Sequence, residues 1–295
     1  MKLLKLCLII GTFIFSPLRF ASYLQDNGRI ALQWSSYDEA DLISKVKSLE
    51  SEVEDEVFSK YYQDLLSKYK HTPFYKKLYF STVGKGLLSQ INELMPKTIV
   101  CKDSVEECFK KALMFHREDI LLRLIYMQSK YQINMSKFLM RKNCDYCENK
   151  QIDFEKEELD AFILAMKIMP KRFHTYLIGR PITMINADNG LYGNGKWTFF
   201  IQWRYLNFIE KIGLAIHEFS HIVGTKSDLD FSKKWLELFR QSRVAGPYDG
   251  FISDYAYTNF AEDFAESLTC FIVSPKLLKK HLPSKYEFFK NSFKF

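Results

Sequence analysis

The pentapeptide His217-Glu218-Phe219-Ser220-His221 is the part of the sequence best suited to do chemistry. On a helix, residues four apart lie on one face, so both imidazoles can reach one metal ion. Imidazole nitrogens bind zinc at about 2.0–2.1 Å. Glu218, one step round the helix, can sit beside the metal and take a proton from the attacking water. The spacing therefore predicts a zinc hydrolase with His217 and His221 as ligands and Glu218 as general base.

A catalytic zinc site needs a third protein ligand, with its fourth position left open for water. No third histidine follows shortly after His221. Two acids, Glu262 and Glu266, stand four residues apart on a later predicted helix, so they share one face. The residues alone predict that this helix brings a carboxylate back to the two histidines, and they leave open which acid binds.

The segments HEFSH and SDYAYTNFAEDFAES together resemble the gluzincin family of the anthrax toxin lethal factor catalytic domain and its bacterial relatives. In that family a Tyr-x-x-Thr-Asn stretch leads into a helix with an acid, two residues and then Ala-Glu. The resemblance covers roughly residues 175–295. It implies a zincin-like metallopeptidase core that holds one zinc ion per chain.

Carried over residue by residue, the resemblance keeps the roles given above to His217, Glu218 and His221. It makes Glu262 the third zinc ligand, because Glu262 stands just before the run Asp-Phe-Ala-Glu. Glu266 would then lie behind the ligands and hold one of the imidazoles. A solvated position on the helix face is the alternative interpretation for Glu266.

Tyr255, seven residues before Glu262, matches the family tyrosine that donates a hydrogen bond to the oxyanion. Tyr257 is the second candidate for that role, and a purely packing aromatic is the alternative for Tyr255. Ser220 departs from the family, whose members often have glycine there, but serine is small enough for metal binding to stand. The N-terminal residues do not resemble the toxin's targeting domains, so no toxin-like delivery or substrate follows.

Two helices have to position these side chains. Residues 206–223 have an amphipathic pattern, and we expect them to form a helix that Gly224 closes. Residues 259–273 are predicted to form the second helix, with Asn259 as its N-cap.

The segments between and before these helices predict strands, a short helix and a loop. Residues 180–187 and 196–203 are rich in β-branched and aromatic side chains and predict two strands. In zincins an edge strand pairs with the extended substrate, so residues 196–203 would supply apolar subsites or, alternatively, only face the core. Residues 230–240 predict a short helix, and residues 241–254 are a candidate loop over the site.

The N-terminal half is predicted to be helical. Apolar residues at steps of three and four predict one long helix over 38–70 and further helices near 104–115, 118–133 and 155–169. The fold class is therefore α+β, with a zincin-like metalloprotease core and a mainly α-helical N-terminal region. The predicted divisions are a signal peptide (1–22), a helical region of unknown role (23–150) and the metallopeptidase domain (151–295).

The first residues have the pattern of an export signal. Lys2 and Lys5 precede an apolar run over 6–15, which is too short to span a membrane comfortably. Ala21-Ser22 offers a cleavage point, and an uncleaved N-terminal anchor is the alternative. We therefore expect an exported protein, periplasmic or extracellular, without stable membrane insertion after cleavage.

Cysteine usage is consistent with an oxidising compartment. Cys101, Cys108, Cys144 and Cys147 predict two disulfides, and four cysteines allow three pairings. A structural four-thiolate zinc site is the alternative. Cys270 lies in an apolar run and predicts a buried free thiol.

The charge balance argues against a nucleic-acid-binding protein. The net charge of +7 falls to +4 without the signal, and basic residues are scattered among acids. The predicted function is a secreted or periplasmic zinc metalloendopeptidase acting on a protein or peptide substrate. The alternative is a cell-envelope binding or scaffold protein that keeps a zincin fold with weak, latent or no activity. In a latent enzyme, residues 23–150 would cover the cleft as a prosegment or recruit one substrate.

Overall fold

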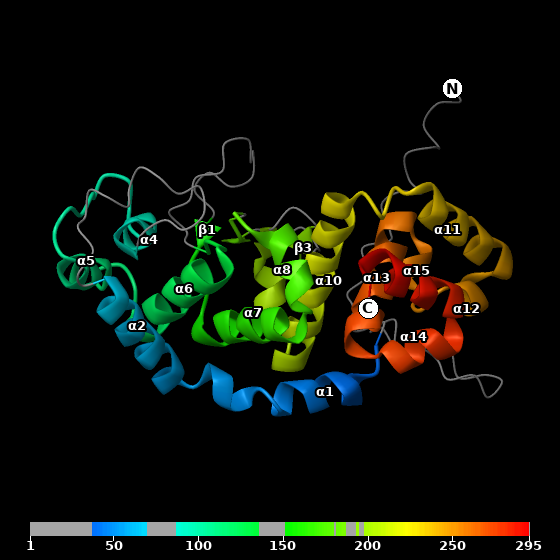
Figure 1. Cartoon of the computed structure of the whole chain (residues 1–295), viewed down its shortest axis with the longest axis horizontal. Helices are drawn as coiled ribbons and strands as arrows, with labels where there is room; N and C mark the ends of the chain where they lie inside the picture. The colour runs from blue at the N-terminus through cyan, green and yellow to red at the C-terminus, as the bar shows by residue number, and fades with distance from the viewer. Residues whose placement is uncertain are drawn as a thin grey trace, which may run out of the picture.

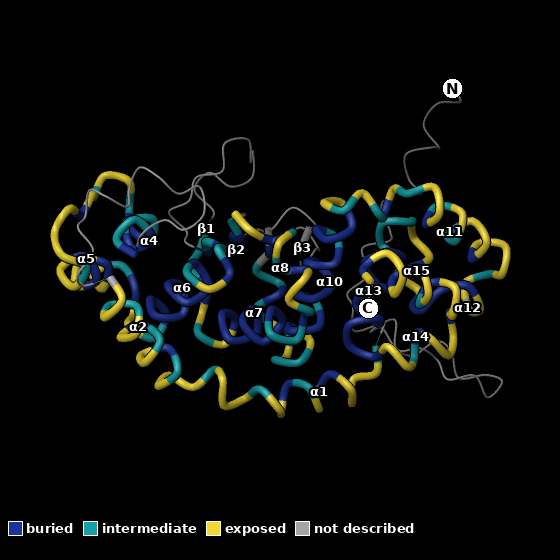
Figure 2. The backbone as a smooth tube through the Cα atoms, in the orientation of Figure 1, coloured by how far each residue is buried: buried dark blue, intermediate teal, exposed yellow. Residues whose placement is uncertain are grey.

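Three apolar helices form the centre of the molecule: α7 (Lys156–Ile168), α10 (Phe208–Ser227) and α13 (Phe260–Val273). In this computed structural model, α10 packs against α7 on one side and α13 on the other. Every residue of α7 from Glu158 to Met166 is buried, and Figure 2 shows the same burial along α10 and α13. The helix that carries HEFSH is therefore held between two others at the core.

The structure describes residues 37–69, 87–135, 151–179, 181–186, 193–194 and 198–294. The signal-peptide prediction for residues 1–22 and the cysteines Cys144 and Cys147 lie outside these residues. The other helical elements are α1 (Glu39–Lys47), η2 (Glu50–Val53), α2 (Asp55–Tyr69), α4 (Leu87–Glu93), α5 (Val105–Ala112), α6 (Glu118–Tyr131), α8 (Lys171–Leu177), α9 (Ile201–Arg204), α11 (Lys233–Ala245), α12 (Pro247–Gly250), η3 (Tyr255–Tyr257), α14 (Pro275–His281) and α15 (Pro283–Phe293).

The described part of the chain is mostly helical with one small mixed sheet, in agreement with the α+β class. The sheet has the order β1-β2-β4-β3, where β2 and β4 are parallel and the outer pairings are antiparallel. Its strands are β1 (Gln151–Ile152), β2 (Thr183–Ile185), β3 (Gly193–Asn194) and β4 (Thr198–Phe200).

The strand predicted over 196–203 ends earlier than expected and lies inside the sheet, although an edge position was predicted. It ends at Phe200, and Ile201 begins α9. Among the described strands β4 is internal, because β2 and β3 pair with its two sides. Phe199 and Trp203 are buried against Phe162, with ring centroids 4.8 and 4.7 Å from its ring. The prediction of a substrate-pairing edge strand is therefore wrong, and these aromatic residues build the core instead.

The single helix predicted over 38–70 is broken into α1, η2 and α2. Glu54 has extended backbone, with ψ of 148°, and separates η2 from α2. Arg123 on α6 donates to the carbonyl of Val53 at 3.0 Å and so binds the chain at this bend. Leu49 and Val53 still pack on the core, which is why the apolar spacing runs through the break undisturbed. Figure 1 shows the resulting path, with α1 and α2 along the lower edge of the molecule.

Gly224 does not close α10, which continues to Ser227 and ends at Asp228 with φ of 57°. A Cβ at Gly224 would lie 2.8 Å from the ring of Phe264, so glycine is needed there for the close approach of α13. The helix predicted over 230–240 extends to Ala245 as α11. The loop predicted over 241–254 is therefore wrong for residues 241–245 and 247–250, which belong to α11 and α12.

The described cysteines agree with the prediction of disulfides in this region and of a buried free thiol at Cys270. Cys101 and Cys108 form a disulfide across the start of α5, and Cys270 is free and buried on α13. The predicted helices near 104–115, 118–133 and 155–169 correspond to α5, α6 and α7. Asn259 caps α13 as predicted.

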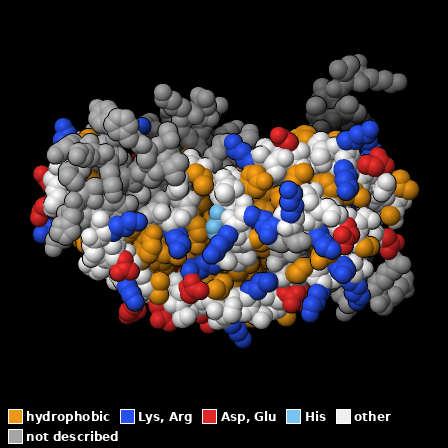
Figure 3. Space-filling view, viewed as in Figure 1, with side chains coloured by type: hydrophobic (Ala, Val, Ile, Leu, Met, Phe, Trp, Pro, Cys, Tyr) orange, Lys and Arg blue, Asp and Glu red, His pale blue; other side chains and the backbone are white. Residues whose placement is uncertain are grey.

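The described helices include none with the length and apolar character to cross a bilayer. On the face in Figure 3, Lys and Arg side chains are dispersed among hydrophobic and acidic ones. One hydrophobic core runs through the described residues of both halves, from Leu42 on α1 to Phe293 on α15.

Candidate metal centre

A capping box fixes the N-terminus of α10, the helix that carries the HEFSH residues. The side chain of Asn207 accepts from the backbone N–H of Glu210, and the Glu210 carboxylate accepts from the N–H of Asn207, each at 2.9 Å. This capping box satisfies two N–H groups that the helix itself leaves unpaired. His217 lies less than three turns further on, where the helix is already buried on both sides.

Helix α13 brings the acids to α10. Asn259 accepts from the N–H groups of Ala261 and Glu262 at 2.9 and 3.0 Å, so the first turn that carries Glu262 is held by its cap. Small side chains let the two helices approach. Ser220 is fully buried, and its hydroxyl lies 3.4 Å from that of Thr269 on α13. A small residue is therefore needed at position 220, and serine meets this need.

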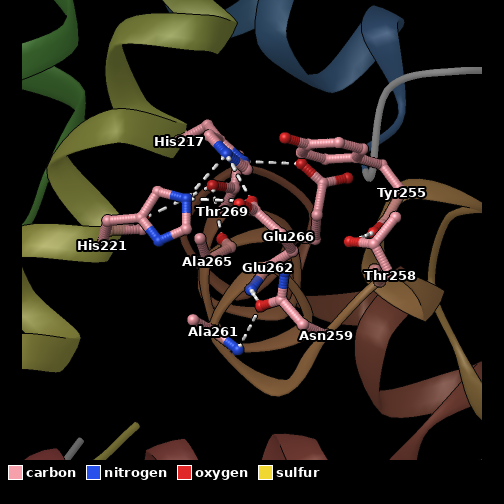
Figure 4. Close-up of polar contacts among 12 residues, drawn as sticks. His217, His221, Tyr255, Thr258, Asn259, Ala261, Glu262, Ala265, Glu266 and Thr269 are labelled. Carbon is pink, nitrogen blue, oxygen red and sulfur yellow. Dashed lines mark hydrogen bonds and ion pairs between the residues drawn. The ribbon is translucent and has the colours of Figure 1, made fainter. Parts of the chain in front are cut away.

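Three ligand atoms converge between the helices (Figure 4). Nε2 of His221 lies 3.1 Å from Nε2 of His217 and 2.9 Å from Oε2 of Glu262, and Nε2 of His217 lies 3.3 Å from the same oxygen. A tetrahedral zinc ion bound at about 2.0–2.1 Å has its ligand atoms about 3.3 Å apart. The triangle thus has the dimensions of one face of a zinc coordination tetrahedron, and its donors are types that zinc prefers.

The electrostatics of this cluster favour positive charge. Burial acts to raise the pKa of Glu262, but hydrogen bonds and charge from His217 and His221 outweigh it and hold the pKa far below its usual range. Burial acts to lower the pKa of His217, but Glu262 and Glu266 outweigh it and raise that pKa well above 6.5. Two carboxylates beside one imidazole therefore stabilise a cation at this point, whether a proton or a metal ion supplies it.

Glu218 is buried next to the triangle with one oxygen unused. Its side chain is only 7% exposed, and Oε2 has no hydrogen-bond partner among the described residues. Burial is the main cause that raises the pKa of Glu218. A buried carboxylate oxygen without a partner is costly unless a ligand or water meets it. Its position and its raised pKa suit a group that accepts a proton.

Glu266 lies one turn after Glu262 and contacts His217 from behind. Oε1 of Glu266 lies 2.6 Å from Nδ1 of His217, a close ion pair whose alignment falls short of a regular hydrogen bond. Oε2 accepts a hydrogen bond from the hydroxyl of Ser253 at 2.6 Å. The structure therefore places Glu266, only 7% exposed, against the imidazole of His217 and not on a solvated face.

Tyr255 and Tyr257 lie in different surroundings. The ring of Tyr255 lies 6.0 Å from that of His217, and Figure 4 shows it beside the site. Burial and the carboxylates of the site raise the pKa of Tyr255, although the residue is 44% exposed. The ring of Tyr257 instead lies 3.9 Å from the Arg243 guanidinium and packs on Phe251. Of the two tyrosines, the structure brings only Tyr255 to the triangle of His217, His221 and Glu262.

Two supporting groups were not predicted from the sequence. Ser253 binds Glu266 and also accepts from the N–H of Ala256 at 3.1 Å, which fixes the turn that carries Tyr255. Lys285 on α15 forms a buried ion pair of 2.6 Å with Asp263 and donates to the carbonyl of Gly250. Neither group is marked by a local pattern in the sequence, because α15 contains two lysines among several other polar residues.

Comparisons with models of protein families, with curated proteins and with solved structures found no match to this chain. The resemblance to gluzincins therefore rests on the HEFSH and SDYAYTNFAEDFAES segments of the sequence alone.

Proposed function

We propose that this chain is an exported zinc-dependent endopeptidase of the gluzincin type, with a zincin-like core. The observation that carries the proposal is the triangle of His217 Nε2, His221 Nε2 and Glu262 Oε2, with sides of 3.1, 2.9 and 3.3 Å. Three donors of the zinc-binding types, at tetrahedral spacing and from two helices, are typical of a catalytic site that keeps one position open.

The roles of the protein's own groups follow from where they lie. A zinc ion held by the triangle would polarise the scissile carbonyl and lower the pKa of the attacking water. Glu218 takes the proton from that water through its unpartnered Oε2 and later delivers it to the leaving amine. The hydroxyl of Tyr255, kept protonated by its raised pKa, donates to the oxygen on which negative charge develops.

Glu266 keeps the histidine ligand in the orientation that the site requires. Its contact with Nδ1 of His217 leaves Nε2 as the nitrogen that faces Glu262 and His221. A carboxylate behind a ligand imidazole also makes the ligand nitrogen more basic, which strengthens metal binding.

The test is cleavage of a diverse peptide library followed by mass spectrometry, together with measurement of bound zinc. We expect the wild-type protein to bind one zinc ion and to cleave peptides. Glu218→Gln keeps the shape of the side chain but removes the general base, so cleavage should fall about 100- to 10,000-fold with zinc retained.

Glu237→Gln is the matched control, because Glu237 is an exposed acid on α11 whose side-chain contacts are both with residues of the same helix, Arg240 at 3.7 Å and Gln241 at 3.2 Å. This control should cleave as the wild type does. Equal cleavage by the Glu218→Gln and wild-type proteins would overturn the mechanism, and a wild-type protein that binds zinc without cleaving any peptide would favour a non-catalytic protein.

A further inference from the structure

Ser253, in the turn before η3, joins two parts of the candidate site through one hydroxyl group. Its Oγ donates to Oε2 of Glu266 at 2.6 Å and accepts from the backbone N–H of Ala256 at 3.1 Å. A serine hydroxyl has one proton, so its donor is used on the carboxylate and a lone pair on the N–H. Ser253 and Glu266 are both buried, and hydrogen bonds are stronger in such a low-dielectric environment.

The first contact of Ser253 leads to the metal centre. Oε1 of Glu266, the other oxygen of the same carboxylate, lies 2.6 Å from Nδ1 of His217. A carboxylate is planar, so a hydroxyl that holds one of its oxygens also limits where the other can point. Partners of this kind fix the orientation of an imidazole that binds a metal. Ser253 is therefore linked to His217 through a single side chain, that of Glu266.

The second contact of Ser253 leads to Tyr255. The N–H of Ala256 and the carbonyl of Tyr255 belong to one planar peptide group. Ser253 accepts from the N–H of that group, and its carbonyl accepts from the hydroxyl of Thr258 at 2.7 Å. Both ends of the peptide group next to Tyr255 are therefore held. The ring of Tyr255 lies 6.0 Å from that of His217, so the two contacts of Ser253 lead to neighbouring side chains.

The segment that leads to Ser253 is anchored separately. Lys285 on α15 donates to the carbonyl of Gly250 at 2.9 Å and forms an ion pair with Asp263 of α13 at 2.6 Å. Lys285 and Asp263 are both buried. Loss of the Ser253 hydroxyl should leave this anchor in place and release only the turn that carries Tyr255.

We propose that Ser253 is a positioning residue whose hydroxyl couples the orientation of His217 to the position of Tyr255. The inference rests on the proposed function, because it assigns a role within the same site. There His217 is a zinc ligand and Tyr255 is the donor to the oxyanion. Ser253 then holds the ligand and the donor in one arrangement, and such preorganisation raises turnover without any contact with the substrate.

The first test compares Ser253→Ala with the wild type in zinc affinity and in turnover of the best-cleaved peptide of the library. Loss of a group that supports a metal ligand directly weakens metal binding about 10- to 100-fold, and Ser253 acts one step further out. We expect the zinc Kd, measured by competition with a chelator, to rise about 3- to 10-fold. At saturating zinc, kcat should fall about 10- to 100-fold because the oxyanion donor is displaced. KM should stay near the wild-type value, since Ser253 is buried.

Ser129→Ala is the control, because the Ser129 hydroxyl donates to the carbonyl of Ile125 at 2.7 Å on α6, which packs mainly on α2, α4 and α7. It should keep the wild-type zinc affinity and kcat. Ser253→Thr keeps a hydroxyl and should restore both quantities toward wild type. A Ser253→Ala protein that matches Ser129→Ala in both quantities would overturn the inference. So would a Ser253→Thr protein as impaired as Ser253→Ala, or a rise in KM with kcat unchanged.

Two double-mutant cycles test the two contacts of Ser253 separately. In a Glu266→Ala background, Ser253→Ala should no longer change zinc affinity, because the carboxylate that Ser253 holds is gone. In a Tyr255→Phe background it should no longer change kcat, because the oxyanion donor is gone. Full additivity in either cycle would overturn the inference.

Failure of the proposed function is measured on the wild-type protein alone. That function fails if the wild type binds no zinc, or if the zinc-loaded wild type cleaves no peptide. In the second case the zinc affinities of Ser253→Ala and Glu266→Ala still decide whether Ser253 supports His217. A wild type that binds zinc and cleaves peptides, with a Ser253→Ala protein that equals it in both, would reject the inference and leave the proposed function standing.

Discussion

Two buried charged networks in this protein are built in opposite ways. In the first, the fully buried guanidinium of Arg123 pairs with Asp160 at 2.6 Å and Asp55 at 2.8 Å. It also donates to the carbonyls of Asp119 and Val53. Every charge there meets an opposite charge or a hydrogen-bond partner. Such a network is complete without any ligand, and its role is to hold α2, α6 and α7 together.

The second network, between α10 and α13, is incomplete in the protein alone. Two imidazole nitrogens and a carboxylate oxygen point at one another within 3.3 Å. Beside them Oε2 of Glu218 has no partner among the described residues. A buried carboxylate oxygen without a partner is costly, so this network differs from the first in one group that the protein itself does not satisfy. The contrast is between a network that is complete within the protein and one that leaves a buried carboxylate oxygen open, as the proposed catalytic role of Glu218 requires.

The largest effect is expected in the structural network. Arg123→Ala leaves Asp160 buried without its main partner and should lower the free energy of unfolding by about 3–5 kcal/mol. Urea denaturation of the metal-free protein measures this loss. Arg240→Ala, at an exposed arginine of α11, is the control and should change stability by less than about 1 kcal/mol. If Arg123→Ala instead lowered zinc affinity with stability intact, the distinction between the two networks would be wrong.

Glu262→Ala should act on the metal centre and not on the fold. Zinc held by four ligands contributes about 10–16 kcal/mol, so one ligand accounts for about 2.5–4 kcal/mol. Zinc affinity should therefore fall about 100-fold or more, and the rise in melting temperature on adding zinc should nearly vanish. Competition with a chelator measures the affinity. Unchanged zinc affinity would transfer the third-ligand role from Glu262 to Glu266.

Glu266→Gln should have a smaller effect, because Glu266 supports a ligand without binding the metal. Glutamine can still accept from Ser253 but carries no charge against His217. We expect zinc affinity to fall about 10- to 100-fold, as is usual for such supporting groups. A loss as large as that of Glu262→Ala would mean that Glu266 binds the metal itself.

The smallest effect, a change in how stability depends on pH, is expected at His174, whose ring contacts backbone carbonyls and not the metal centre. Nε2 of His174 lies 2.8 and 3.2 Å from the carbonyls of Met166 and Met169, and burial is the main cause that lowers its pKa below 6.5. The unfolded chain then binds more protons than the folded one just below pH 6.5, so His174 lowers stability as the pH falls through that value.

His174→Gln should remove this part of the pH dependence, visible as the difference from wild type in urea denaturation between about pH 5 and 7. Zinc affinity should stay at the wild-type value, since His174 lies on α8 and outside the ligand triangle. A variant that lost zinc would show that the triangle is not the metal site.

Sequence reasoning succeeded where the signal is local. The i, i+4 spacing of His217 and His221, the cap at Asn259 and the amphipathic patterns depend on a few neighbouring residues, and the structure forms the corresponding helices. It failed where a distant contact decides. At the break near Val53 the backbone carbonyl accepts from Arg123, and Gly224 lies inside α10 at the point where Phe264 packs against it. Neither partner is visible in the local pattern.

The sequence by itself therefore determined the donor set, because helix geometry fixes which side chains share a face whatever the rest of the chain does. Only the tertiary structure decided which acid faces the Nε2 atoms of both histidines and which contacts Nδ1 of His217. It also decided which tyrosine lies beside His217. Glu262 and Glu266 are equivalent by spacing, and the packing of α13 on α10 separates them. Tyr37 meets Gly213 across 176 positions of the sequence, and only the packed core brings such residues together.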